Sequence, residues 1–174
     1  MHYNQLNAKL SNLKTMKMLK ITMVIFLLLN SVIVQADEFL PEFSFPDVDE
    51  KMHSISEWKG KTLVINFWAT WCQPCLKEIP AFLQLQTQYG KQNVQFIGIA
   101  VDEVSAVISY KNKAVINYPI LISSEWESFN LAQQLGNNSN TVPYTVVVNS
   151  TGKIIYRHAG EVKKEDLESV IASK

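Results

Sequence analysis

The chain has 174 residues, 47% of them hydrophobic and 18% charged, and its formal net charge is zero. This size is typical of one globular domain, long enough to bury a core, together with a short targeting segment. The only charges before residue 37 are lysines, so the remaining part carries 12 basic and 16 acidic residues and a net charge of −4. That balance lacks the basic surplus of a nucleic-acid-binding protein, and we expect no nucleic-acid partner.

The amino-terminal segment, residues 1–36, is predicted to be an export signal. Its lysines precede an apolar run at residues 21–34, and Val34-Gln35-Ala36 places small residues just before a cleavage position. Cleavage before Asp37 would release a soluble domain, residues 37–174, into the periplasm or another extracytoplasmic space. The alternative is an uncleaved membrane anchor, although this run is shorter than the about 20 apolar residues that usually span a bilayer.

The first part of the domain predicts a hairpin, a strand and a helix. Residues 39–61 contain scattered aromatic side chains, prolines and a polar turn cluster, which indicate a short hairpin or an extended arm. Residues 62–68 are almost continuously apolar and rich in β-branched and aromatic side chains, typical of a strand buried on both faces. Apolar residues then recur at helical spacing until Tyr89-Gly90, where the glycine is expected to end the helix, and Pro80 is expected to kink it.

The later segments continue the alternation of strands and helices. Residues 94–101 predict a second buried strand and residues 103–113 an amphipathic helix, so the two buried strands are expected to pair in parallel. Further along we expect a short strand at 118–122 and then a helix that ends at Gly136 and contains Trp126, Phe129, Leu131 and Leu135. Two antiparallel strands at 144–148 and 153–157 and a closing helix at 161–174 complete the predicted elements. The fold class is therefore α/β, with a central mixed sheet flanked by helices.

The only two cysteines, Cys72 and Cys75, stand three positions apart at the predicted start of a helix. This spacing places both sulfurs on one helix face, where they can form a small disulfide ring. The free N–H groups and the positive end of the helix dipole favour a thiolate, and Pro74 suits the first turn because it has no N–H to leave unpaired. We expect Cys72 to attack a substrate disulfide and Cys75 to resolve the mixed disulfide.

Two other interpretations of the cysteine pair are open. A purely structural disulfide would gain little, because so small a ring removes little chain entropy. A zinc site needs four ligands, and His53 and His158 lie in an arm and at a strand end without ligand spacing. We therefore favour redox exchange and expect no bound metal.

The stretch from Leu63 to Pro80, which includes Trp71-Cys72-Gln73-Pro74-Cys75, resembles the thioredoxin superfamily and, within it, the exported TlpA/ResA-like thiol-disulfide oxidoreductases. The resemblance extends to the amino-terminal arm, to Thr141-Val142-Pro143 and to the final hairpin with Gly160, and so covers nearly all of the chain after residue 36. It implies a thioredoxin-like fold and a protein thiol-disulfide oxidoreductase whose dithiol needs no cofactor.

The resemblance also assigns roles around the cysteines. Pro143 looks like the family's cis-proline, and the backbone of Val142 before it would pair with an extended substrate segment. Trp71 matches a family aromatic residue expected at the surface, beside the substrate. Gln73 and Pro74, inside the ring, are expected to tune the reduction potential.

Glu78 matches the family position of a carboxylate that influences the active-site thiols. Its i+3 spacing from Cys75 returns it to the cysteine side of the helix, where it could assist proton transfer, although a solvated helix glutamate is the alternative. Ordinary thioredoxins place a buried aspartate six residues before the first cysteine, where this chain has Asn66. An amide cannot take a proton, so any base must be Glu78 or solvent.

The leading hypothesis is an exported, monomeric reductant of disulfides in other exported proteins, with apocytochrome c in cytochrome c maturation as the first substrate class to test. A membrane electron donor of the DsbD or CcdA type would re-reduce the pair. The alternative within enzymes is a disulfide oxidant or isomerase that uses the same residues. A peroxiredoxin fits less well, because Thr70 stands two residues before Cys72 rather than three, and a copper chaperone would need CxxxC with a placed histidine.

Overall fold

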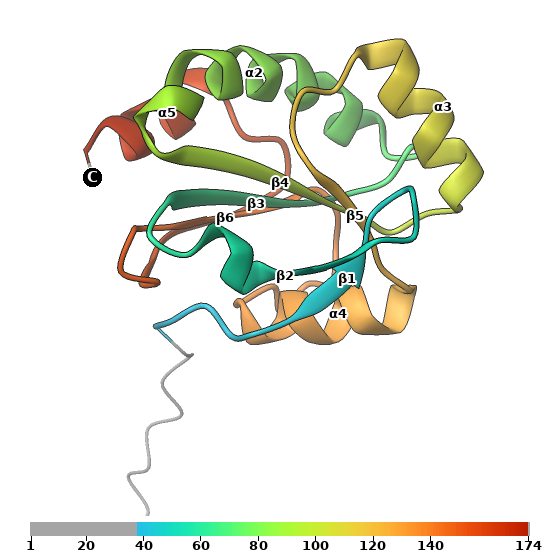
Figure 1. The fold of residues 1–174 in the computed structure, drawn as a ribbon, viewed down its shortest axis with the longest axis horizontal. Coiled ribbons are helices and arrows are strands. Elements are labelled where there is room, and N and C mark those ends of the chain that lie inside the picture. The colour runs from blue at the N-terminus through green and yellow to red at the C-terminus, as the bar shows by residue number, and fades with distance from the viewer. Residues whose placement is uncertain (1–37, 174) are drawn as a thin grey trace, which may run out of the picture. The chain divides into compact units, whose positions relative to one another are not determined.

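A five-stranded mixed sheet forms the centre of the domain in the computed structural model, which describes residues 38–173 (Figure 1). The strand order is β5-β4-β3-β6-β7. The strands are β3 (Thr62–Trp68), β4 (Val94–Ala100), β5 (Ile120–Ile122), β6 (Tyr144–Val148) and β7 (Ile154–Ala159). β3 pairs in parallel with β4, and β4 with β5, whereas β6 is antiparallel to both β3 and β7.

The central strand β3 is buried along its whole length. Its apolar, largely β-branched and aromatic side chains suit a strand that is covered on both faces. The predicted parallel pairing of the two buried strands is confirmed, with Thr62 opposite Val94 and Trp68 opposite Ala100. Because parallel strands carry their carboxyl ends at one edge, the chain leaves β3 directly into the segment that holds the cysteines.

Helices cover both faces of the sheet (Figure 1). α2 (Gln73–Tyr89), α3 (Val104–Ala114) and α5 (Lys164–Ala172) lie on one face, where their apolar residues pack against alternate side chains of β3, β4 and β6. α4 (Glu125–Gln134) lies on the other face with an amino-terminal hairpin of β1 (Ser44–Pro46) and β2 (Met52–Ser54), followed by the short 3₁₀ helix η1 (Ile55–Trp58). The predicted mixed α/β class and the amino-terminal hairpin are thus confirmed.

The predicted end of the first long helix is confirmed, and the predicted start of the last one is not. α2 contains Pro80 and ends at Tyr89 with Gly90 as its C-cap, although Gly90 keeps a right-handed conformation because the 3₁₀ turn η2 (Gly90–Gln92) follows at once. The left-handed residue that ends this run is Asn93, with φ of 61°. α5 begins at Lys164 rather than Glu161, because the chain before it stays extended to make a contact with α2.

The helix predicted around Trp126 is present, but only part of its apolar set faces the core. Leu131 and Leu135 are buried, whereas Trp126 is 72% exposed and Phe129 is 36% exposed. α4 therefore carries two aromatic side chains on the outer surface of the domain.

The predicted signal or anchor at residues 1–36 lies outside the described residues. Within residues 38–173, no helix is both long enough and apolar enough to cross a membrane.

Candidate active site

Cys72 and Cys75 form a disulfide at the amino end of α2, with their Cα atoms 5.3 Å apart. Cys72 is the N-cap of the helix, and its Sγ accepts a hydrogen bond from the backbone N–H of Cys75 at 3.3 Å. Gln73 and Pro74 are exposed in the first turn, where the missing N–H of proline leaves no donor unpaired. The helix start therefore presents a backbone donor and its positive dipole end to the sulfur of Cys72.

The two sulfurs differ in their access to solvent. Cys75 is fully buried, Cys72 retains 5% exposure, and the neighbouring Trp71 is 67% exposed. An incoming disulfide can reach the disulfide ring only from the side of Cys72. This arrangement suits an exchange reaction that begins at Cys72 and is completed by the enclosed Cys75.

The peptide bond between Val142 and Pro143 is cis, as the family resemblance implies. Val142 packs against the apolar cluster that contains both cysteines, and Pro143 is buried at the start of β6. Segments about 70 residues apart in the sequence therefore meet at the disulfide.

Glu78 is buried, with only 2% of its surface exposed, and it sits one helical turn after Cys75. Its Oε1 accepts a hydrogen bond from Asn66 Nδ2 at 2.8 Å, and its Oε2 accepts one from the backbone N–H of Val162 at 3.0 Å. Burial raises the pKa of Glu78 to about 7, although both hydrogen bonds favour the charged form. The solvated alternative for Glu78 is therefore wrong, and its carboxyl can exchange a proton near neutral pH.

Asn66 and Asp102 shape the site in ways that the sequence did not reveal. Asn66 also donates a hydrogen bond to Thr145 Oγ1 on β6 at 3.1 Å, so it ties β3, β6 and α2 together under the disulfide. Asp102, just after β4, accepts hydrogen bonds from the backbone N–H and the hydroxyl of Thr70 and so fixes the loop that leads to the cysteines. A polar residue at the carboxyl end of a parallel strand was the available signal for Asp102.

The two histidines within residues 38–173 have different partners, and neither partner is a cysteine. His53 contacts Asp47 and Glu57 in the amino-terminal hairpin, whereas His158 on β7 contacts the carbonyl of Glu161. Within residues 38–173, no cluster of three or more histidine, cysteine or acidic side chains is arranged to hold a metal ion.

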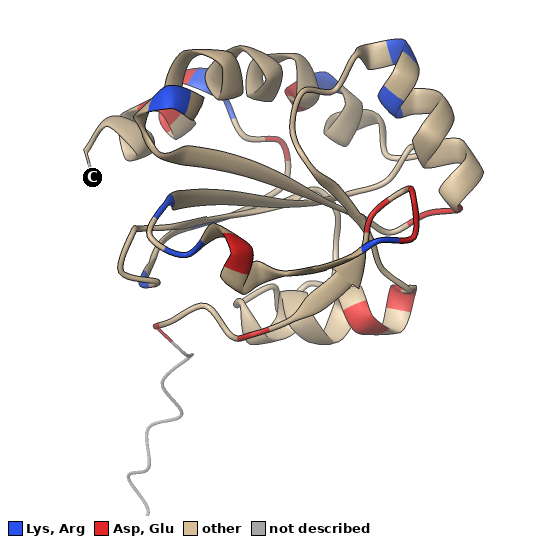
Figure 2. Cartoon of the chain, in the orientation of Figure 1, with Lys and Arg blue, Asp and Glu red and all other residues tan. Residues whose placement is uncertain are grey.

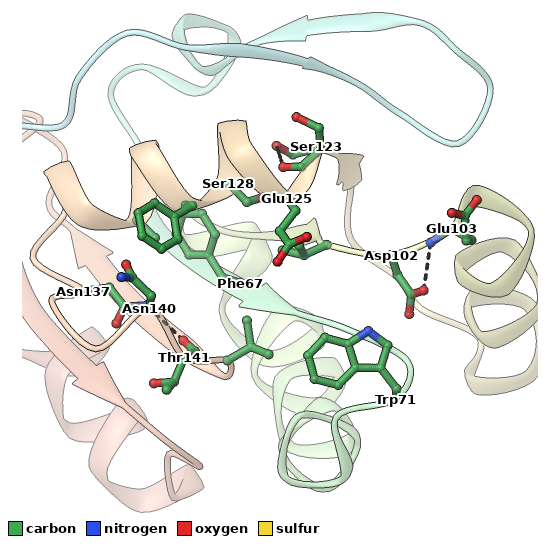
Figure 3. Close-up of a pocket in the computed structure, with 15 residues that line it drawn as sticks. Phe67, Trp71, Asp102, Glu103, Ser123, Glu125, Ser128, Asn137, Asn140 and Thr141 are labelled. Atoms are coloured by element: carbon green, nitrogen blue, oxygen red, sulfur yellow. Dashed lines mark hydrogen bonds between the residues drawn. The ribbon is translucent and has the colours of Figure 1, made fainter.

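A pocket of about 630 Å³ opens beside the disulfide, between α4 and the ends of β3 and β4 (Figure 3). Trp71, which precedes Cys72, and Val142, which precedes Pro143, are both part of its lining. Its other walls come from Phe67 of β3, from the loop after β4, from α4 and the serines just before it, and from the polar loop before β6. The pocket is therefore placed to receive a side chain of a polypeptide bound at the disulfide.

Comparison with known proteins gives a consistent result. The Redoxin family matches residues 35–171. The thiol-disulfide oxidoreductase ResA of Geobacillus kaustophilus is 29% identical over 134 residues, which cover 76% of this chain and 74% of that protein. ResA of Bacillus thuringiensis is 30% identical over 132 residues, which cover 75% and 73%. The crystal structure of a thiol:disulfide interchange protein from Chlorobium tepidum matches with a TM-score of 0.71 and 30% identity, covering 78% of this chain and 94% of that one.

These likenesses span the sheet, the helices and the segments that meet at the disulfide. They confirm the resemblance to the thioredoxin superfamily that the stretch around the cysteines indicates. In this chain the disulfide lies at the start of a helix, and only its first cysteine is accessible. The chain belongs to the Redoxin family within the thioredoxin superfamily and is a ResA-like protein thiol-disulfide oxidoreductase.

Proposed function

We propose that this oxidoreductase works as an exported reductant of disulfides in other exported proteins, with apocytochrome c as its first candidate substrate. The observation that carries the proposal is the buried carboxyl of Glu78, with a pKa of about 7, one helical turn from the enclosed Cys75. A negative charge there disfavours a thiolate on the same helix face. A dithiol whose thiolate is less stabilised gives up its electrons more readily, so Glu78 favours a reducing protein.

The exchange begins with the accessible Cys72. Its thiolate, stabilised by the Cys75 N–H and the helix dipole, attacks one sulfur of the substrate disulfide. A bond forms between Cys72 Sγ and that sulfur, the substrate S–S bond breaks, and the second substrate sulfur leaves as a thiolate that takes a proton from solvent. Trp71 and the backbone of Val142 would hold the substrate segment beside Cys72 during this step.

Cys75 completes the reaction. The Glu78 carboxylate accepts the proton of the Cys75 thiol, and the resulting thiolate attacks Cys72 Sγ. The mixed disulfide breaks, the remaining substrate sulfur leaves as a thiolate, and Glu78 returns the proton to it. Two electrons have then passed to the substrate, and the protein is left with the Cys72–Cys75 disulfide seen in the structure.

Continued turnover needs an outside source of electrons, because an oxidising compartment lets disulfides persist. A membrane protein of the DsbD or CcdA type would supply two electrons per cycle, and one proton would restore the thiol of Cys75 beside the thiolate of Cys72. Export is supported by the lysines and the apolar run at residues 21–34, which have the order of a signal or an anchor.

The direction of electron flow can be tested in the producing cell. Rapid acid quenching followed by thiol alkylation should show Cys72 and Cys75 mainly reduced when the donor is present and oxidised when the donor is deleted. Full oxidation in cells with an intact donor would contradict a reductant and would favour the oxidant or isomerase.

The substrate can be tested by deleting the gene and measuring covalently bound haem in c-type cytochromes. We expect a loss that the wild-type chain restores and the Cys72→Ser variant does not. An added small-molecule thiol should restore the haem as well, because the missing step is a reduction. Normal haem attachment in the deletion strain would contradict the apocytochrome substrate.

A further inference from the structure

The pocket beside the disulfide is strongly acidic. Asp102, Glu103 and Glu125 belong to its lining, and among the described residues that line it there is no lysine, arginine or histidine. Figure 2 shows acidic residues at the start of α4 and in the segment that leads into α3, and residues from both places line the pocket. A site with one sign of charge attracts ligands of the opposite sign.

The carboxylates of the pocket are available to an incoming cation. Partial burial opposes ionisation of Asp102, but hydrogen bonds from Thr70 and from the Glu103 N–H outweigh it and hold the pKa of Asp102 below its usual value. Asp102 is thus a fixed, charged group. Glu103 and Glu125 are exposed, and neither forms an ion pair with another residue of the described part of the chain.

A second observation at the same place points to a missing ligand. Ser128 of α4 lines the pocket and is 97% buried. Its hydroxyl has no hydrogen-bond partner among residues 38–173. Buried hydroxyl groups are nearly always paired, because leaving one unpaired costs about 1–3 kcal/mol. A donor that enters the pocket would satisfy Ser128 Oγ.

The rest of the lining combines an apolar part with uncharged polar side chains from the loops before α4 and before β6, namely Ser123, Ser124, Asn137, Asn140 and Thr141. The apolar part includes Phe67 and the exposed ring of Trp71, which Figure 3 labels, together with Phe129 and Val142. Lysine and arginine bury a long aliphatic stem along apolar surface while their charged ends meet polar groups, and a tryptophan ring also attracts a cation. Apolar side chains for the stem, with carboxylates, an unpaired hydroxyl and uncharged polar groups for the charged end, match such a side chain.

We propose that this pocket is a specificity site that binds a lysine or arginine side chain of the substrate polypeptide, close in sequence to the cysteine that Cys72 attacks. The occupant is set by charge: a carboxylate side chain would be repelled, and a purely apolar one would leave Ser128 Oγ unpaired. Because Trp71 and Val142 belong to both the pocket and the surroundings of the disulfide, a bound basic residue would hold the neighbouring cysteine beside Cys72. The inference rests on the proposed reductant function and deepens it by naming the substrate class.

The test uses the full reduced chain and synthetic peptides with one intramolecular disulfide. The peptides are identical except that the residue flanking the disulfide, on either side, is lysine, norleucine or glutamate. Reduction rates are measured by acid quench, alkylation and mass spectrometry, and each is divided by the rate of the same protein with hydroxyethyl disulfide, a small neutral substrate. We expect lysine at one of the two flanks to be favoured over norleucine by about fivefold at low salt, and glutamate to react more slowly than norleucine.

Variants of the pocket test whether the preference for the lysine peptide arises there. Glu125→Gln and Ser128→Ala, alone and together, should reduce the lysine preference toward equality, and 0.5 M salt should weaken it in the wild-type chain. Glu165→Gln removes an equivalent exposed charge from the start of α5, away from the pocket lining, and should keep the preference.

Equal normalised rates for the lysine and norleucine peptides at both flanks would overturn the inference while leaving the reductant function intact. So would a lysine preference that survives in the Glu125→Gln, Ser128→Ala double variant, since the basic residue would then bind elsewhere. Failure to reduce any of the disulfides, hydroxyethyl disulfide included, would overturn the proposed function and the inference with it.

Discussion

The carboxyl group of Glu78 is buried, and it accepts two hydrogen bonds, from Asn66 Nδ2 and from the backbone N–H of Val162. Burial disfavours its charged form, while the two donors favour that form. The outcome is a pKa of about 7, at which the group is half ionised in neutral solution. Such a group can exchange a proton with the active-site thiols without a large free-energy cost.

The stability of the oxidised protein should depend on this titration. The unfolded chain releases the Glu78 proton near pH 4.5 and the folded chain near pH 7, so the folded state loses stability as pH rises through this interval. Relative to Glu78→Gln, the wild-type free energy of unfolding should fall by about 3 kcal/mol between pH 4 and pH 8, measured by urea denaturation. Glu165→Gln is the control and should follow the wild type, whereas a Glu78→Gln profile parallel to the wild type would contradict the burial argument.

Because only Cys72 is accessible to solvent, the two single-cysteine variants should differ in how much mixed disulfide they form with a substrate. In Cys75→Ser, the accessible Cys72 should form a mixed disulfide with a peptide disulfide that persists, because the resolving thiol is absent. In Cys72→Ser, the fully buried Cys75 should form at most a trace of such an adduct. Intact-protein mass spectrometry after thiol blocking measures both, and equal adduct levels in the two variants would contradict the assigned order of attack.

At the scale of elements, β4 lies close against the side chain that ends β3. A Cβ atom added to Gly98 would approach Trp68 Nε1 to 2.9 Å and Tyr118 to 3.5 Å, so only glycine fits this position of β4 without movement. Trp68 is itself nearly fully buried and contacts Tyr110 of α3. The packing of α3 and β4 around this indole holds the end of β3, from which the cysteine loop departs.

Gly98→Ala should therefore destabilise the domain by about 1–3 kcal/mol, because the alanine methyl forces the indole to shift within a full core. The free energy of unfolding from denaturant titration measures this cost. In a Trp68→Phe background the clashing nitrogen is gone, so the same alanine substitution should cost clearly less. An equal cost in both backgrounds would show that the contact with Trp68 is not the cause.

The elements were predictable to different degrees for physical reasons. β3 and β4 are long apolar runs between polar segments, and their parallel pairing follows from the strand-helix-strand order. The start of α5 was not predictable, because residues 161–163 stay extended so that the Val162 N–H can reach Glu78, which is 84 positions away. The role of Asn66 was not predictable either, because its hydrogen bonds to Glu78 and Thr145 depend on how α2 and β6 pack. In the sequence, Asn66 showed only that the usual aspartate is missing.

At the scale of the whole molecule, charge and compartment set the expected partners. The part of the chain after residue 36 has a net charge of −4, and acidic residues border the pocket beside the disulfide. The proposed export of a dithiol protein with this charge would require both an electron donor and substrates that the acidic active-site face attracts. The central claim is that the dithiol is a reductant.

The equilibrium reduction potential of the Cys72–Cys75 pair tests that claim most directly. The purified chain is equilibrated in dithiothreitol redox buffers at pH 7, and the reduced fraction is measured by tryptophan fluorescence or by alkylation. We predict a potential close to the about −270 mV of thioredoxin, and a higher potential in Glu78→Gln, where no negative charge disfavours the thiolate. A wild-type potential close to the about −120 mV of DsbA would contradict a reductant and would identify the protein as a disulfide oxidant.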